Sequence, residues 1–64
     1  MNDVDKRLKL ARIGMGLSQR QLAAQAGCAE NLISRIETGR VRPDSATAER
    51  IAKLLNKRPW EIGL

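Results

Sequence analysis

The 64-residue sequence has no histidine, tyrosine or phenylalanine, and it has only one tryptophan and one cysteine. Without histidine there is no imidazole for acid–base catalysis or for metal binding. One cysteine forms no internal disulfide, which favours a reducing, cytoplasmic setting. No apolar run is long enough for a signal peptide or a membrane span. We therefore expect no enzyme, no metal or other cofactor, and no membrane association.

Positive charge is in excess, with 12 lysines and arginines against 7 acidic residues and a net charge of +5. The isoelectric point of about 10.4 exceeds the value of roughly 9 that indicates a nucleic-acid-binding domain. An anionic membrane surface or an acidic protein would also suit this charge. No aromatic residues alternate with the basic ones, which argues against stacking on single-stranded bases. The charge alone therefore does not distinguish duplex DNA from an anionic membrane surface or an acidic protein as the partner.

The length predicts a single domain over residues 1–64, with no linker, repeat or low-complexity segment. Folding a chain of this size buries only about 60% of the surface that the unfolded chain exposes. A partner subunit would therefore help to stabilise it.

The most informative stretch is residues 18–37, which predicts two short helices joined by a tight turn. Ser18 is suited to cap the first helix, and Gln21 three residues later completes a capping box. Leu22 and Ala26 then share one helical face. Gly27 follows directly and tolerates the left-handed conformation that ends a helix and turns the chain.

The second helix of this stretch is expected from about Ala29 to about Ile36. Its apolar positions, Leu32, Ile33 and Ile36, have helical spacing and predict a face that packs on the core. The polar residues between them point away from the core.

The rest of the sequence also predicts helices and loops, and no segment has the pattern of a β-strand. A first helix is expected from Val4 to Gly14, with Asp3 as a candidate cap. Residues 38–44 form a loop, and a helix capped by Asp44 or Ser45 follows and ends at Asn56 in a left-handed turn. Pro59 suits the first turn of a fifth, very short helix. The fold class is therefore all-α, with five short helices.

This pattern resembles the phage repressor and Cro family of small bacterial or phage regulators. The resemblance covers about Leu8 to Ile62, and its central motif spans about residues 18–37. It is carried by Leu17-Ser18-Gln19, Leu22-Ala23, Gly27, Ile33-Ser34-Arg35-Ile36-Glu37, Gly39 and Pro43. It implies a compact, lambda-repressor-like five-helix domain that binds double-stranded DNA. The implied function is transcription regulation, as a repressor on an inverted-repeat operator.

The resemblance also implies roles for individual residues. The positions that read bases in the major groove fall on Ala29, Glu30, Asn31, Ser34 and Arg35. Those that contact phosphates fall on Gln19, Thr38, Arg40 and Arg42. If the protein does not bind DNA, the polar residues of the second helix form a solvated surface with no partner. Glu30 is then an acid favoured by its place near a helix N-terminus, and the loop arginines are solvated charges. Arg12 and Glu37 match a pair that forms an internal salt bridge in the family.

The C-terminal segment is the expected dimer interface, through Leu55, Trp60, Ile62 and Leu64. A weak homodimer would form fully on DNA, within the cytoplasm and bound to the nucleoid, and no small-molecule ligand is expected. Cys28 is interpreted as a small packing residue rather than a redox sensor. The alternative function is a protein-interaction module on the same fold, such as an antitoxin or an anti-repressor adaptor.

Overall fold

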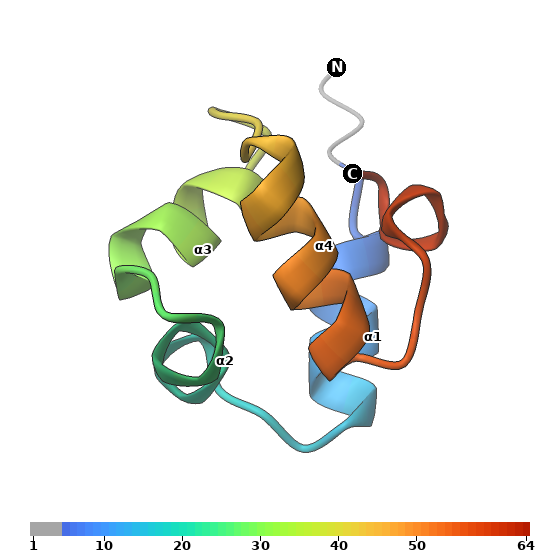
Figure 1. Cartoon of the computed structure of the whole chain (residues 1–64). Helices are drawn as coiled ribbons and strands as arrows, with labels where there is room; N and C mark the ends of the chain where they lie inside the picture. The colour runs from blue at the N-terminus through green and yellow to red at the C-terminus, as the bar shows by residue number, and fades with distance from the viewer. Residues whose placement is uncertain (1–4) are drawn as a thin grey trace.

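The computed structural model describes residues 5–64, which fold into helices and loops without a strand (Figure 1). The elements in chain order are α1 (Arg7–Gly14), α2 (Gln19–Ala26), α3 (Glu30–Glu37), α4 (Ser45–Leu54) and the 3₁₀ helix η1 (Pro59–Ile62). The expectation of five helices is therefore corrected to four α-helices and one 3₁₀ helix. Proline lacks an amide proton and Gly63 follows at φ 79°, so this short segment leaves little room for α-helical hydrogen bonds.

The first helix begins later than its sequence predicted, at Arg7. Asp5 accepts a hydrogen bond from the Arg7 amide at 3.0 Å and pairs with the Arg7 guanidinium at 2.7 Å. The hydrogen bonds from the Arg7 side chain and amide hold the pKa of Asp5 at about 2. This local turn occupies the backbone that would extend the helix. Val4 and the candidate cap Asp3 lie outside the described residues.

Two predicted N-terminal caps are confirmed. The Ser18 hydroxyl accepts from the Gln21 amide at 3.0 Å, and the Gln21 side chain accepts from the Ser18 amide at 2.8 Å. Of the two candidates for α4, Asp44 is the cap and accepts from the Thr47 amide at 2.7 Å. That hydrogen bond lowers the pKa of Asp44 below its ordinary value.

All four α-helices end with the same pair of backbone hydrogen bonds, the Schellman motif, around one left-handed residue. After α2 this residue is Gly27 at φ 71°, and the Cys28 amide donates to the Ala23 carbonyl at 3.0 Å. After α4 it is Asn56 at φ 57°, as the sequence predicted. These endings reverse the chain within a few residues, so short helices pack closely.

Substituting Gly27 tests the turn that joins α2 to α3. No atom lies within 4 Å of a Cβ built on Gly27, so the cost of Gly27→Ala is conformational rather than steric. We expect a loss of about 1–2 kcal/mol in the free energy of unfolding. The control is Gly14→Ala, which also meets no atom but has no positive φ and should stabilise α1 by about 0.5–1 kcal/mol. Urea unfolding of both variants would refute the assignment if they shifted in the same direction.

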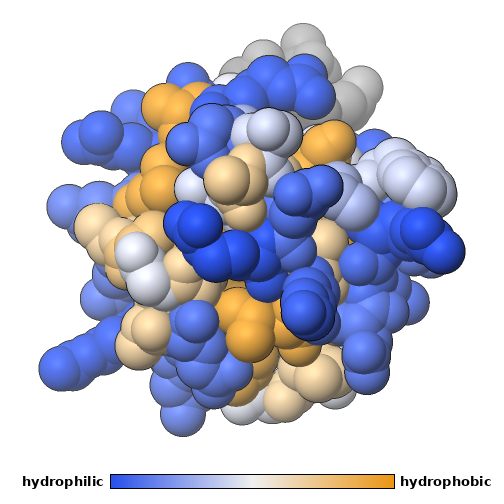
Figure 2. All heavy atoms as spheres, in the orientation of Figure 1, coloured by the Kyte–Doolittle hydropathy of each residue, from blue (hydrophilic) through white to orange (hydrophobic). Residues whose placement is uncertain are grey.

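The core lies where α2 meets α3 and α4, and α1 and η1 close it from the other side (Figure 1). Its most buried large side chains are Leu22, Ile33, Ile51, Leu55 and Ile62. On the face drawn in Figure 2, hydrophilic residues cover most of the surface and hydrophobic ones form separate patches. Every helix described is too short or too polar to cross a lipid bilayer.

Candidate nucleic-acid interface

Helix α3 has one apolar and one polar face. Ile33 and Ile36 are buried in the core and Leu32 is half-buried, as the sequence predicted. Three residues of the predicted base-reading set, Glu30, Asn31 and Arg35, are exposed on the helix, and Ala29, the exposed N-cap, precedes them. Ser34 is half-buried. The helix therefore presents amide, carboxylate and guanidinium groups to solvent while its other face is held in the core.

The loop after α3 is tied to the end of that helix. The Arg40 amide donates to the Arg35 carbonyl at 2.8 Å, and the Gly39 amide donates to the Ile36 carbonyl at 3.1 Å. Val41 is half-buried against the core, whereas Arg40 and Arg42 are exposed on either side of it. The two cationic side chains are thus held beside the C-terminal end of α3.

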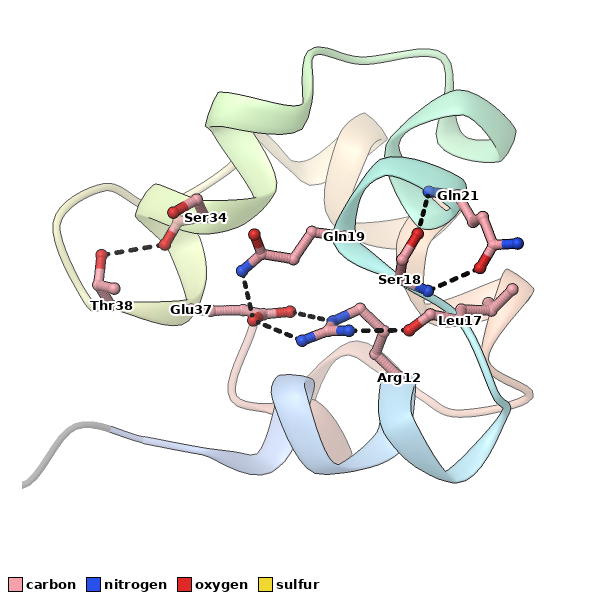
Figure 3. Close-up of polar contacts among 8 residues, drawn as sticks. All are labelled: Arg12, Leu17, Ser18, Gln19, Gln21, Ser34, Glu37 and Thr38. Atoms are coloured by element: carbon pink, nitrogen blue, oxygen red, sulfur yellow. Dashed lines mark hydrogen bonds and ion pairs between the residues drawn. The ribbon is translucent and has the colours of Figure 1, made fainter.

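A buried polar network joins α1, α2 and α3 (Figure 3). The Arg12 Nε donates to Glu37 Oε2 at 2.7 Å, and Arg12 Nη2 donates to Glu37 Oε1 at 3.1 Å. The Arg12 Nη1 donates to the Leu17 carbonyl at 2.8 Å, and Gln19 Nε2 donates to Glu37 Oε1 at 3.0 Å. The Arg12 and Glu37 side chains are 9% and 3% exposed, which confirms the predicted internal salt bridge.

The residues predicted to contact phosphate differ in whether their side chains have a free hydrogen-bond donor. Gln19 Nε2 has two N–H groups and gives one to Glu37, so one remains. The single hydroxyl proton of Thr38 is directed to the Ser34 carbonyl at 3.0 Å. Phosphate oxygens accept hydrogen bonds, so in this rotamer Thr38 has no side-chain donor for them. Gln19, Arg40 and Arg42 remain the better-placed members of the set.

Sequence reasoning missed a second interaction that fixes the motif. The Arg50 Nε of α4 donates to the Ala26 carbonyl at 3.1 Å, and Arg50 Nη2 donates to the Thr47 hydroxyl at 3.3 Å. A cation at the C-terminal carbonyls of α2 is favoured by the helix dipole. The partners lie 24 residues apart, so no local pattern indicates the contact.

The predicted dimer interface needs correction. Leu55 and Ile62 are each 2% exposed and lie in the core of the chain itself, because the last turn of α4 and η1 close over it. Neither offers surface to a second copy. Trp60 is 66% exposed, with the Arg58 guanidinium 5.5 Å from its ring centroid, and Leu64 is half-buried. Trp60 and Leu64 are the two predicted residues that remain accessible.

Cys28 is half-buried against the core, as expected for a small packing residue. Within residues 5–64, no three histidine, cysteine, aspartate or glutamate side chains lie close enough together to hold a metal ion.

Comparison with known proteins identifies the family. No curated protein sequence matches the chain significantly. The crystal structure of the restriction-modification controller protein C.AhdI from Aeromonas hydrophila is similar, with a TM-score of 0.83 and 27% sequence identity. The match covers 92% of this chain and 89% of that one. A helix-turn-helix family model matches residues 8–61. The chain therefore belongs to the helix-turn-helix family of phage repressor and Cro type, whose members are DNA-binding transcription regulators.

Proposed function

We propose that the protein is a sequence-specific regulator that represses transcription by binding an inverted-repeat operator in the major groove. The observation that carries this proposal is the polar, exposed face of α3 on a helix whose other face is fixed in the core. The major groove is about 12 Å wide and admits an α-helix. Binding at a cytoplasmic promoter, with no catalytic step, would then exclude the polymerase.

The exposed groups of α3 suit base edges in different ways. Arg35 has the two-pronged donor geometry for guanine, and Asn31 can both donate to and accept from adenine. Glu30 can accept from cytosine, and the Ala29 methyl can contact a thymine methyl. Ser34 is half-buried, so its hydroxyl would contact a base edge only where the DNA approaches the helix most closely. Selection of bound duplexes from a random pool tests this proposal, and recovery of no common sequence would contradict it.

The loop arginines supply a separate prediction. Arg40→Ala and Arg42→Ala should each weaken specific and non-specific binding alike and reduce the slope of log K against log salt by about 1. Lys57→Ala is the control, because it removes the same charge from an exposed position that follows the far end of α4. Binding titrations at several salt concentrations measure the slope. An unchanged slope in the arginine variants would show that they do not contact phosphate.

Two copies of the chain are expected on each operator. One recognition helix reads few base pairs, and a genome offers many chance matches to so short a site. A two-fold pair related through Trp60 and Leu64 would double the contacts and place its α3 helices about 34–36 Å apart. Sedimentation and footprinting on the selected duplex measure the stoichiometry and spacing. One chain on a site without an inverted repeat would contradict the dimer.

A restriction-modification operon is a second candidate target, because the similar protein of known structure is a controller of such a system. The selected sequence should then occur upstream of an endonuclease or methyltransferase gene in the source genome. A reporter placed behind that site would fall in expression when the protein is supplied, if the protein represses. A rise would identify an activator.

The rival interpretation is a protein-interaction module on the same fold. An apolar α3 face would favour it, whereas the exposed residues of α3 are charged or carry an amide. A protein that folds but retains no duplex from the random pool would support the rival.

A further inference from the structure

The Glu37 carboxylate lies where three helices meet, and both of its oxygens are used. Its Oε2 accepts from Arg12, while its Oε1 accepts from both Arg12 and Gln19 (Figure 3). Glu37 is the last residue of α3, and Gln19 is the first residue of α2. One carboxylate therefore connects the end of the base-reading helix to a predicted phosphate contact.

An ionised carboxylate only accepts hydrogen bonds, so it fixes which end of the Gln19 amide faces it. The NH₂ group must turn towards Glu37, and Figure 3 shows the amide oxygen directed away. One N–H is used at 3.0 Å, and the second stays free as a donor. Glu37 would repel a nearby phosphate, but its close pair with Arg12 offsets that charge.

We propose that Glu37 is a positioning residue for DNA binding, which holds the Gln19 amide so that its second N–H donates to a backbone phosphate. The inference rests on the proposed function. Because Glu37 belongs to α3, the phosphate contact and the base-reading side chains are held in one register. The buried pair with Arg12 thus orients a contact as well as stabilising the fold.

A double-mutant cycle on the selected duplex tests the inference. A hydrogen bond to a charged group such as phosphate is worth about 1.5–3 kcal/mol, so Gln19→Ala should weaken binding roughly 10–150-fold in the wild-type background. In the Glu37→Gln background, where the facing group also has donors, the same change should weaken binding less than about 2-fold. Gln25→Ala, an exposed amide further along α2, is the control and should show no coupling to Glu37. Circular dichroism establishes a temperature at which every variant is folded.

A purely structural role for Glu37 would make the two losses additive within about 2-fold, which would overturn the inference. Nuclear magnetic resonance of the wild-type protein provides a second measurement that needs no variant. The two Gln19 side-chain protons should differ, with one protected from exchange and the other shifting when DNA is added. Exchange as fast as that of Gln25 would also overturn it. Absence of any duplex binding by the wild-type protein would instead overturn the proposed function.

Discussion

Replacing Arg12 with alanine is expected to lower the free energy of unfolding by about 3–5 kcal/mol, since it leaves the buried Glu37 carboxylate without its cation. The total stability of a 64-residue chain is roughly 3–10 kcal/mol, so this loss is a large fraction of it. In a domain of this size, 1 kcal/mol corresponds to about 4–8 °C in melting temperature. Thermal unfolding followed by circular dichroism measures the shift.

The matched control is Lys9→Ala, which removes the same charge from the exposed side of α1. It should melt close to the wild type. The double variant Arg12→Met/Glu37→Leu should recover most of the loss, because apolar groups of similar volume often replace a buried ion pair at little cost. Equal melting temperatures for Arg12→Ala and Lys9→Ala would show that the pair contributes nothing through its burial.

Removing a base-reading side chain is expected to change specificity rather than general affinity. Arg35→Ala and Asn31→Ala should each cost about 1–3 kcal/mol on the selected duplex, the value of a bidentate contact with one base. Asn31→Ala should reduce the affinity for random duplexes only slightly, since affinity for random DNA comes from phosphate contacts. Arg35→Ala should lose more affinity for the selected duplex than for random duplexes. Competition titrations at fixed salt concentration measure both.

The control for these variants is Gln25→Ala, an exposed amide on α2 outside the predicted contact set. It should bind both kinds of duplex as the wild type does. The base-reading assignment fails if the specific and random sites lose affinity by the same factor in the α3 variants.

Short-range signals in the sequence predicted the framework well. The Ser18–Gln21 capping box, the left-handed Gly27 and the left-handed Asn56 are set by residues within a few positions of each other, and all three are confirmed. The apolar stripe of α3 was also predicted, because helical periodicity directly reports which face is buried. The resemblance to the family supplied the Arg12–Glu37 pair, which joins positions 25 residues apart.

Interactions that depend on tertiary packing were not predictable in the same way. The Arg50 contact with the end of α2 and the Gln19 contact with Glu37 each need two helices in place. The sequence shows that Leu55 and Ile62 are apolar, but not whether they face the core or a partner. Met15 shows the same limit, since it is also apolar and yet is 49% exposed. The start of α1 was missed because the Asp5–Arg7 pair competes locally with the helix.

The position of Trp60 determines what optical spectroscopy can report on this protein. Trp60 is the sole aromatic residue, and it is 66% exposed with its ring beside the Arg58 guanidinium. Its fluorescence therefore follows the C-terminal segment, and the aliphatic core has no chromophore of its own. Unfolding should change the emission little, whereas a second chain covering the ring should shift it to shorter wavelength. The native protein thus carries a built-in optical probe of self-association that needs no label.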